Sequence, residues 1–505
     1  MDLISVDDMK IVDENSTYLG VHSSLLMENA GNGVSRVVQS QLDSKSKNKI
    51  VVFAGTGNNG GDGFVAARHL AGNPLNEVKV FLVGNPDKIR TNDAKSNWNA
   101  ILSMDSIEKL QIHDSSEIEL YFEKFQEADI IVDALLGTGI YGKIREPIAS
   151  IIKYINKLDV KKVSIDIPSG MNPETGKVTD ICVKADVTVT FHKAKPGLLK
   201  NDQKIGKLEI VSIGIPPEAE YIAGPGDLRF VAKKRKINSH KGDFGKVLVI
   251  GGSDQYCGAP AIASLAALKT GSDLVIIVAP KSIATPLRSY SPNLIVRDYP
   301  DNFLTPEIIT EIKKYIEWAS SIIIGPGLGL REETVKAVNQ IIELIKIKKR
   351  PILIDADAIK SIADNKNILK GTQTVITPHL GEFKIFTKNK VILPENILER
   401  AKIVNKLAKE YNTTILLKGN FDIIANGARF KINKTGTPAM TVGGTGDCLS
   451  GIIGSLLGRK ISPFRSAVAG AFLCGKAGEL AEKEANGPHI LATDLLKYIS
   501  FQNFL

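Results

Sequence analysis

Two glycine-rich segments of this sequence each carry an aspartate at a position where it could do chemistry. Residues 55–63 read Gly-Thr-Gly-Asn-Asn-Gly-Gly-Asp-Gly and follow the apolar run Ile50–Ala54. Residues 443–447 read Gly-Gly-Thr-Gly-Asp and precede the helical pattern Leu449–Leu457. Glycines permit close approach of a ligand, and the free backbone N–H groups at the start of a helix bind anions such as phosphate. Both segments therefore predict anion-binding turns with a carboxylate beside them.

The first segment also fits the G-x-G-x-x-G fingerprint of dinucleotide-binding folds, through Gly55, Gly57 and Gly60. In those folds an acidic residue about 20 residues further on binds the ribose at the end of the second strand. Here the second apolar run, Val78–Val83, is followed by Gly-Asn, and the nearest acid is Asp87. We therefore discount a site for an ordinary redox cofactor, although a plain tight turn would not need Asn-Asn-Gly-Gly-Asp.

Two further aspartates stand at the ends of apolar runs. Asp133 precedes the glycine-containing loop Gly137–Lys143, and Asp166 precedes Ile-Pro-Ser-Gly. An aspartate at such a place can be a helix cap, but the carboxyl ends of parallel strands also border the ligand crevice. Two such aspartates, each followed by a glycine-containing loop, favour a site. Asn59, Asp133 and Ser169 offer oxygen ligands, which suit a hard cation such as potassium better than a transition metal.

Asp447 lies beside the second predicted anion-binding turn, where it could take a proton from an attacking hydroxyl. Phosphoryl transfer needs little from a protein beyond positioning and stabilisation of charge. The sequence has no G-x-x-x-x-G-K-[ST] segment, which excludes a P-loop. His379 is a second candidate in this half, and the alternative interpretation is a satisfied core or turn histidine.

The elements that must position these residues are two series of short apolar runs separated by helical patterns. Such runs predict strands of parallel sheets covered by helices on both faces. We expect an α/β protein with a Rossmann-like domain over residues 1–215, a linker over 216–240 and a second α/β domain over 241–505. The predicted strands of the two series are Ile50–Ala54, Val78–Val83, Ile130–Leu136, Val163–Ile167, Val187–Phe191, Leu208–Ile213, and then Val247–Ile250, Leu274–Val278, Ile322–Ile324, Ile352–Ile354, Val375–Thr377 and Ile415–Leu417.

Composition narrows the class of protein. The chain has 505 residues, too many for one ordinary core, and four cysteines without a C-x-x-C pair. The N-terminus lacks the basic and apolar stretches of a signal peptide, and no apolar run approaches the ~20 residues that cross a bilayer. We expect a cytoplasmic protein without membrane contact. The net charge of +9 suits a phosphate-rich small substrate, since the main basic cluster, Lys233–Lys236, lacks the aromatics typical of nucleic-acid binding.

The first half resembles the NAD(P)H-hydrate epimerase domain. The resemblance is carried by AGTGNNGGDG (54–63), DALLGTG (133–139), DIPSG (166–170) and LMENAG (26–31). It implies that Asp166 does acid–base work at the reacting ring of hydrated NADH or NADPH. It implies potassium at Asn59, Asp133 and Ser169. The residues implied to contact the hydrate are Asn58, Asn59, Gly60, Gly61, Asp62, Gly137, Thr138, Gly139, Ile140, Tyr141, Gly142, Lys143 and Asp166.

The second half resembles the ribokinase-like superfamily and, within it, the ADP-dependent NAD(P)H-hydrate dehydratase domain. The narrower resemblance is carried by HKGDFG (240–245), GPGLG (325–329), DADA (355–358), TPHLGE (377–382) and LKG (417–419). Leu380 departs from the family, which has a proline that stiffens the turn after the histidine. The residues implied at the hydrate are Ala263, Gly327, His379 and Asp447, and those implied at the adenine nucleotide are Lys418, Gly419, Asn420, Phe421, Asp422 and Gly446.

Together the two resemblances imply a bifunctional enzyme, an isomerase and a lyase, that repairs the NADH and NADPH hydrates NADHX and NADPHX. One half interconverts the R and S hydrates, and the other dehydrates the S form. Asp447 would deprotonate the ring hydroxyl, ADP with magnesium would phosphorylate it, and loss of phosphate would restore the reduced ring and leave AMP. We further expect a homo-oligomer. The alternatives are a small-molecule kinase of a vitamin precursor and a non-catalytic binding module in the first half.

Overall fold

A computed structural model describes residues 2–139, 142–232 and 235–504. The chain forms two compact units, Met1–Pro217 and Glu218–Leu505. Among the described residues, no helix is both long and apolar enough to cross a membrane. All four cysteines are free thiols.

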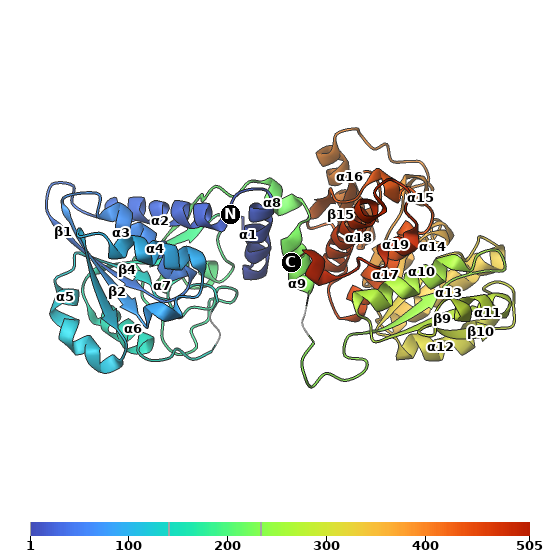
Figure 1. Cartoon of the computed structure of the whole chain (residues 1–505), viewed down its shortest axis with the longest axis horizontal. Helices are drawn as coiled ribbons and strands as arrows, with labels where there is room; N and C mark the ends of the chain where they lie inside the picture. The colour runs from blue at the N-terminus through green and yellow to red at the C-terminus, as the bar shows by residue number, and fades with distance from the viewer. Residues whose placement is uncertain (1, 140–141, 233–234, 505) are drawn as a thin grey trace. The chain divides into compact units, whose positions relative to one another are not determined.

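The first unit is a parallel seven-stranded sheet with the order β3-β2-β1-β4-β5-β6-β7. Helices cover both of its faces (Figure 1). Its strands are β1 (Asn48–Ala54), β2 (Asn76–Val83), β3 (Ile107–Ile112), β4 (Ile130–Ala134), β5 (Lys161–Ile165), β6 (Val187–Phe191) and β7 (Lys207–Val211). Its helices are α1 (Val6–Tyr18), α2 (Ser23–Gln39), α3 (Asn58–Leu70), α4 (Asn92–Leu102), α5 (Phe122–Gln126), α6 (Ile148–Lys157) and α7 (Asp202–Ile205).

The burial of the central strand explains its continuous apolar run. Ile50 and Val52 pack under α2, α3 and α4, whereas Val51 and Phe53 pack under α5 and α6. Successive side chains of a strand point to opposite faces, so a strand covered on both sides needs apolar residues at every position. In this order β1, β4 and β5 are neighbours. The sheet therefore brings the ends of the strands before Gly55, Asp133 and Asp166 to one edge, as predicted.

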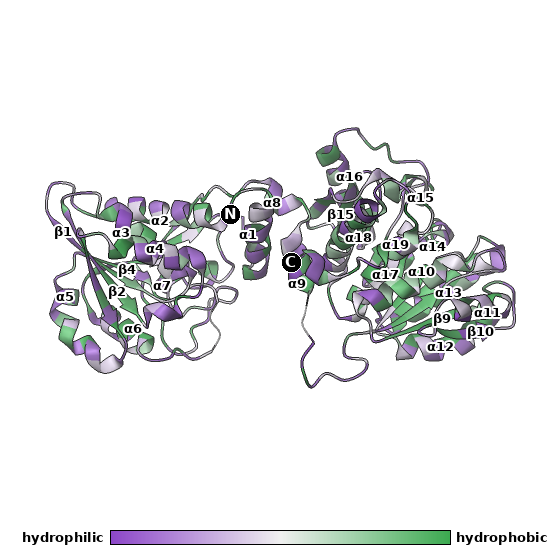
Figure 2. Cartoon of the chain, in the orientation of Figure 1, coloured by the Kyte–Doolittle hydropathy of each residue, from purple (hydrophilic) through white to green (hydrophobic). Residues whose placement is uncertain are grey.

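The second unit is a nine-stranded sheet with the order β10-β9-β8-β11-β12-β13-β14-β15-β16. All neighbouring strands are parallel except the pairs β14–β15 and β15–β16, which are antiparallel. Figure 2 shows the hydrophobic character of the strands around β9. The strands are β8 (Lys246–Ile250), β9 (Leu274–Pro280), β10 (Ile295–Tyr299), β11 (Ser321–Ile324), β12 (Ile352–Ile354), β13 (Thr374–Ile376), β14 (Thr414–Leu417), β15 (Asp422–Ala425) and β16 (Phe430–Asn433).

Two helical layers enclose this second sheet. One includes α10 and the long α17–α18 pair, and the other includes α12, α13 and α16. The helices of the unit are α8 (Glu218–Tyr221), α9 (Pro225–Val231), α10 (Gly258–Thr270), α11 (Lys281–Tyr290), α12 (Ile309–Trp318), α13 (Glu332–Ile347), α14 (Asp357–Ser361), α15 (Leu380–Phe386), α16 (Ile397–Tyr411), α17 (Thr445–Gly458), α18 (Pro463–Ala485) and α19 (Ala492–Leu495).

The predicted linker over residues 216–240 is wrong for its first half. α8 and α9 belong to the second unit, where Leu228 and Val231 are completely buried. Asp227 forms a buried ion pair of 2.7 Å with Lys431 of β16. The Gly-Pro pair before α9 suggested a break in structure, but it is the start of a helix, because proline suits the first helical position.

A glycine sets the close approach of α10 and α17. A Cβ atom built on Gly451 would lie 2.1 Å from the backbone oxygen of Ala263, so Gly451→Ala should force the two helices apart. We expect a destabilisation of about 1–3 kcal/mol, the usual cost of overpacking, measured by hydrogen exchange of the second unit. Gly258→Ala on α10 is the matched control, because its Cβ would meet nothing within 4 Å. Equal stability of the two variants would refute the role of Gly451.

Candidate active sites

The Asn-Asn-Gly-Gly-Asp segment forms the first turns of α3, not the loop that the glycines predict. A Cβ on Gly60 would lie 1.9 Å from the backbone oxygen of Gly55, and one on Gly63 would lie 2.6 Å from the Cβ of Ala134. These glycines let α3 start close against the sheet, and this tertiary demand overrides their low helix propensity. The N-terminus of α3, with its free N–H groups, consequently lies at the carboxyl edge of β1 and β4.

Asp133 ends β4 and is completely buried. Its carboxylate accepts hydrogen bonds from the hydroxyls of Ser164 (2.8 Å) and Ser169 (2.6 Å) and from the backbone N–H of Ser169 (2.9 Å). Burial raises the pKa of Asp133, and these hydrogen bonds oppose that rise. Asn59, 7% exposed, packs against the Gly137 turn, and its amide nitrogen has no acceptor among the described residues. The structure thus joins Asp133 directly to Ser169 and places Asn59 at the loop that follows β4.

Asp166 follows β5 with a left-handed backbone, φ 63°, which few residues other than glycine adopt. Its backbone N–H donates to the oxygen of Val189 on β6 at 2.7 Å, which ties the turn to the sheet. Its Oδ1 accepts from the Nζ of Lys195 at 2.5 Å and from the hydroxyl of Thr190 at 3.2 Å. The carboxylate of Asp166 is therefore fixed by Lys195 and Thr190, and Asp166 does not cap a helix.

Two further carboxyls share this site. Burial raises the pKa of Asp62 well above its usual range, and the charges of Asp166 and Asp13 add to the rise. Burial likewise raises the pKa of Asp13 to about 7, with Lys195 opposing and Asp166 adding. The first unit therefore assembles three aspartates and one lysine from α1, α3, the end of β5 and the loop after β6.

The other predicted contacts of the first unit that the structure describes lie at the start of α3 and in the loop after β4. Gly137, Thr138, Gly139, Gly142 and Lys143 belong to the loop after β4, whereas Ile140 and Tyr141 lie outside the described residues. The side chain of Asn58 instead bonds to Thr91: its Oδ1 accepts a hydrogen bond from the hydroxyl of that residue at 2.6 Å.

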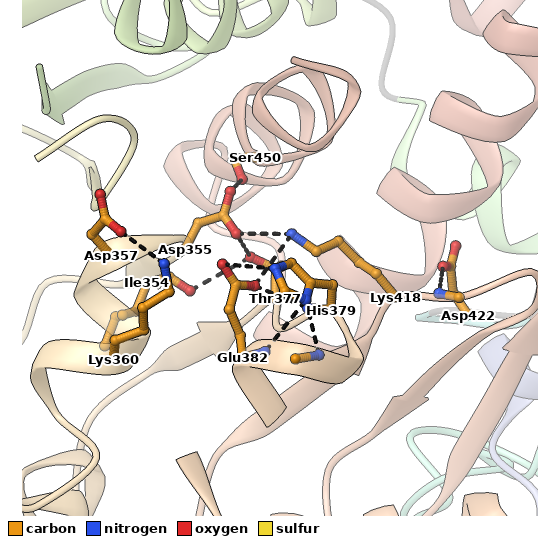
Figure 3. Close-up of polar contacts among 12 residues, drawn as sticks. Ile354, Asp355, Asp357, Lys360, Thr377, His379, Glu382, Lys418, Asp422 and Ser450 are labelled. Atoms are coloured by element: carbon orange, nitrogen blue, oxygen red, sulfur yellow. Dashed lines mark hydrogen bonds and ion pairs between the residues drawn. The ribbon is translucent and has the colours of Figure 1, made fainter. Parts of the chain in front are cut away.

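The second unit centres on a buried ion pair between Asp355 and Lys418 (Figure 3). The Nζ of Lys418 lies 3.1 Å from Oδ1 of Asp355, which also accepts from the hydroxyl of Thr377 (2.8 Å), whereas Oδ2 accepts from the hydroxyl of Ser450 (2.6 Å). Burial alone would raise the pKa of Asp355, but Lys418 and the two hydroxyls lower it below its usual range. Asp355 is thus a fixed anion that joins the ends of β12, β13 and β14 to α17.

Asp447 lies in the first turn of α17, the helix that starts with the Gly-Gly-Thr-Gly segment. Gly444 has φ 96°, so the turn into the helix requires glycine. Burial raises the pKa of Asp447 to about 7, the charge of Asp355 adds to the rise, and Lys418 opposes it. A Cβ on Gly446 would lie 3.4 Å from the Nζ of Lys418, which places that ammonium beside the helix start. A base that titrates near neutral pH is well matched to accept a proton.

His379 caps α15. Its Nδ1 accepts from the backbone N–H groups of Gly381 (3.0 Å) and Glu382 (3.3 Å), and Oε2 of Glu382 accepts from the backbone N–H of His379 (3.0 Å). This capping box makes the turn without the proline that Leu380 replaces. The ring is 58% exposed, with its Nε2 3.4 Å from Glu382. His379 is therefore an exposed cap at the edge of the Asp355–Lys418 pair and not a core histidine.

Residues 418–422 form the tight turn between β14 and β15. The backbone N–H of Lys418 donates to the oxygen of Pro378 at 2.8 Å, and that of Gly419 donates to Oδ1 of Asp422 at 3.1 Å. Burial raises the pKa of Asp422 to about 6, although Asn433 and Gly419 hydrogen-bond to it. Asn420 and Phe421 are exposed at the tip of the turn.

The two remaining predicted residues differ in their setting. Gly327, with φ 69°, lies against Tyr256, because a Cβ there would be 2.9 Å from that side chain. Ala263 is completely buried in the contact of α10 with α17. Its side chain is therefore enclosed between helices and does not line an open surface.

Several residues of these sites were not predicted from the sequence. Asp355 and Glu382 lay in motifs that carried the resemblance but had no role assigned to them. Asp355 directly follows a strand, which was an available signal, whereas Glu382 lies in the first turn of α15 and had no such signal. Lys195 also follows a strand, but a lysine gives no sign of burial. Asp13 gave no signal, because only the packing of α1 brings it to the site.

Lys418 offers a test of the electrostatics of Asp447. Because the ammonium lowers the pKa of Asp447, Lys418→Met should raise that pKa above 7. The carboxylate form then appears only at higher pH, so the rising limb of the rate against pH moves to higher pH. Lys434→Met is the matched control, since it removes the same charge near Phe421 but does not act on Asp447. A limb that stays in place in Lys418→Met would contradict the assignment.

Comparisons with known proteins agree with the two units. A family model described as NAD(P)H-hydrate dehydratase matches residues 247–500, and one described as the N-terminus of YjeF-related proteins matches residues 23–197. A solved ADP/ATP-dependent NAD(P)H-hydrate dehydratase from Bacillus subtilis, co-crystallised with ATP/Mg²⁺, is 26% identical with a TM-score of 0.47, over 56% of this chain and 99% of that one.

Curated relatives match the whole length. The bifunctional NAD(P)H-hydrate repair enzyme Nnr of Methanothermobacter thermautotrophicus is 44% identical over 500 residues, which cover 97% of this chain and 93% of the relative. The enzyme of the same name from Pyrobaculum aerophilum is 42% identical over 501 residues, which cover 98% and 97%. The chain therefore belongs to the family of bifunctional NAD(P)H-hydrate repair enzymes.

Proposed function

We propose that the second unit dehydrates the S hydrate of NADH or NADPH at the expense of ADP. The observation that carries this proposal is Asp447, a base with a pKa of about 7 in the first turn of a helix whose N–H groups can stabilise an anion. Asp447 takes the proton of the ring hydroxyl, and the freed oxygen attacks the terminal phosphorus of ADP. AMP leaves with the electrons of the broken phosphate bond.

The phosphorylated hydrate then loses phosphate. The lone pair of the ring nitrogen expels the phosphate group, and loss of a proton from the neighbouring carbon restores the double bond. Hydrate and ADP thus become NADH or NADPH, AMP and phosphate, with the hydroxyl oxygen retained in the phosphate. Water is a poor leaving group near neutral pH, so this transfer explains why a lyase would use a phosphoryl-transfer site.

We assign the adenine nucleotide to the turn of residues 418–422 and to Gly446. Lys418 lies beside Gly446, since a Cβ atom built on that glycine would lie 3.4 Å from the Nζ of Lys418. The exposed backbone and ring at the tip of the turn, Asn420 and Phe421, are suited to contact a base and ribose. His379 and Gly327 would border the hydrate on the other side of Asp447.

The charges of this site support a divalent cation. Asp355, Glu382 and Asp447 all act on the single ammonium of Lys418, so negative charge exceeds positive charge among these groups. A nucleoside diphosphate would be repelled unless a cation accompanied it. Magnesium prefers oxygen ligands and usually binds through one or two carboxylates together with phosphates and water. We assign the buried Glu382 to it, where the ion would neutralise phosphate charge.

We propose that the first unit interconverts the R and S hydrates. Inversion at the hydroxyl-bearing carbon needs a proton donor and an acceptor. Asp166 is held by Lys195 and Thr190, and Asp62 beside it has a raised pKa. The start of α3 and the loop after β4 would hold the phosphates of the hydrated nucleotide.

The residues beside this site fit a potassium ion. Asp133 is a completely buried carboxylate whose partners are hydroxyls and backbone N–H groups, and burial raises its pKa. A monovalent cation held by Asn59, Asp133 and Ser169 would offset that buried charge, and oxygen donors are the ligands that hard cations prefer. The ion would fix the loop after β4 and would take no part in proton transfer.

We also propose that the chain associates with copies of itself and does not act on nucleic acid. Association is supported by the exposed apolar side chains of Leu380, Ile385 and Ile392 on and beside α15. The phosphate groups of the proposed substrates can account for the net positive charge of the chain, so binding of nucleic acid is not needed to explain that charge.

The dehydration is tested by following a heavy-oxygen label placed in the hydroxyl of the hydrate. With ADP and magnesium, we expect NADH, AMP and phosphate in equal amounts, and the label in the phosphate. A stable phosphorylated product would instead identify a small-molecule kinase. Unlabelled phosphate would show that ADP is hydrolysed separately and would reject the proposed transfer.

A further inference from the structure

Lys195 is a buried lysine that the reaction described above has not used directly. It lies in the loop after β6 and is 1% exposed. Its Nζ lies 2.5 Å from Oδ1 of Asp166, 3.1 Å from the hydroxyl of Thr190 and 3.3 Å from the backbone oxygen of Phe191. These three contacts match the three donors of an ammonium group. Lysine is almost never buried without a charged partner, and here that partner is Asp166.

The charged groups that face Lys195 come from three other elements. Asp166 follows β5, Asp62 lies on α3, and Asp13 lies on α1. The charge of Lys195 opposes the rise in pKa of both Asp62 and Asp13. One ammonium thus faces three carboxyl groups, and only Asp166 forms an ion pair with it. The three carboxyls are therefore not equivalent, because only Asp166 has a directly bonded counter-charge.

The N-terminal segment fixes the loop that carries Lys195. The backbone N–H of Ile4 donates to the oxygen of Ala194 at 3.0 Å, and Leu3 forms a parallel bridge to Ala194. The N–H of Val6, at the start of α1, donates to Glu174 at 2.6 Å. These bonds fix Ala194, the residue before Lys195, through an N-terminal segment that is not part of the sheet. They also fix the start of the helix that brings Asp13 to the same place.

Inversion of the hydrate requires two carboxyls in different protonation states. A protonated group gives its proton to the ring hydroxyl, which leaves as water while the lone pair of the ring nitrogen forms a double bond to the carbon. Water then adds to the opposite face, and an ionised group takes its extra proton. Two neighbouring carboxyls can divide these roles only if their environments differ.

We infer that Lys195 is the positioning residue of this site: its ammonium holds Asp166 as an oriented carboxylate and thereby leaves Asp62 to carry the proton. The inference rests on the proposed interconversion of the R and S hydrates. Lys195 acts through Asp166 and does not itself touch the reacting ring. Lys195 also opposes the rise in the pKa of Asp13, so α1 is part of the electrostatics of the site although it precedes the matched residues 23–197.

The test compares Lys195→Met with Thr190→Val in the full chain. The kcat and KM for conversion of the R to the S hydrate are measured against pH, without ADP, by chromatography of the two forms. A bonded opposite charge favours the ionised form of a carboxyl group, and Lys195→Met removes that charge, so we expect the rising limb of kcat to move up by about one pH unit. Below that limb, each unit lowers kcat about tenfold. Thr190→Val removes one hydroxyl from Asp166 but keeps the charge, so its limb should stay in place.

Two further variants distinguish the effect of the Lys195 charge from a failure of Lys195→Met to fold. Lys195→Arg keeps the charge and should restore the position of the limb. Asp166→Asn/Lys195→Met should be no slower than Asp166→Asn alone, because Lys195 acts only through Asp166. It also removes both members of the buried pair, so it carries the test if Lys195→Met fails to fold, as judged by hydrogen exchange of β4 to β6.

An unmoved limb in Lys195→Met, or an additional loss in the double variant, would overturn the inference. If the unchanged chain itself fails to interconvert the hydrates, the proposed function of the first unit is wrong instead. Dehydration of the S hydrate should stay at its original rate in every one of these variants, and this shows that the second unit is intact.

Discussion

Replacing Asp447 by asparagine should lower kcat for dehydration of the S hydrate by about 10²- to 10⁴-fold, the usual contribution of a general base. Asparagine has nearly the same shape but cannot accept the proton of the hydroxyl. It also removes a buried carboxyl whose pKa is raised to about 7 by burial and by Asp355, so the variant should be at least as stable as the original protein. Binding of ADP should change little, which separates loss of the base from loss of the site.

The unchanged enzyme should show the matching dependence on pH. Asp447 is the base only when ionised, so the dehydration rate should fall as the pH drops below about 7. Interconversion of the R and S hydrates in Asp447→Asn should keep its original rate, because that reaction belongs to the other unit. Substantial dehydration by Asp447→Asn, with the original pH dependence, would assign the base to another residue.

Replacing Asp166 by asparagine should lower the rate of hydrate interconversion by a similar factor, about 10²- to 10⁴-fold. Among the residues that the structure describes, the substitution removes the only carboxylate that Lys195 contacts directly and leaves its ammonium without a paired anion. Loss of a partner from a buried ion pair is costly, at roughly 3–5 kcal/mol, so folding must be checked by hydrogen exchange of β5 and β6.

Dehydration provides the internal control for that variant. With pure S hydrate, Asp166→Asn should form NADH as fast as the original enzyme, because Asp447 and the nucleotide site are unchanged. With pure R hydrate, NADH should form only as fast as the R form converts spontaneously. Unchanged interconversion by a folded Asp166→Asn would refute Asp166 as the acid–base residue.

The fold was predictable wherever strands are buried on both faces. The continuous apolar runs predicted the central strands of both sheets, such as Ile322–Ile324, which are completely buried. β3, β10, β15 and β16 were missed. β3 and β10 lie at sheet edges with exposed positions along them, so they carry no continuous apolar run. β15 and β16 form an antiparallel hairpin of four residues each, and polar residues such as Asp422 and Lys431 shorten or interrupt their apolar runs.

Helix starts were less predictable, because glycine is ambiguous. Glycine-rich residues 58–63 suggested a loop by propensity, but they form the first turns of α3, since only glycine fits against Gly55 and Ala134. Gly224 and Pro225 suggested a linker for the same reason and instead start α9. In both cases the contact that decides the structure lies outside the local sequence.

The residues of the two sites also differ in whether they could be predicted from the sequence. Asp133 and Asp166 were predictable because they follow strands, and the order of strands brings them to one edge. Lys195 and Asp13 were not, because their roles depend on packing across the unit. The partnership of Asp355 with Lys418 spans 63 residues and was likewise invisible in the local pattern. The sequence therefore shows which polar residues follow strands, but it does not show which charged side chains contact one another in the folded protein.

Mixing the two inactive variants tests most directly whether two separate sites act in succession on the hydrate. Pure R hydrate with ADP and magnesium is given to Asp166→Asn, to Asp447→Asn and to an equal mixture, and formation of NADH is followed by its absorbance. Each variant alone should form little NADH. The mixture should approach the original enzyme, because one variant supplies S hydrate and the other dehydrates it. A mixture no faster than Asp166→Asn alone would contradict the division of the reaction between the two units.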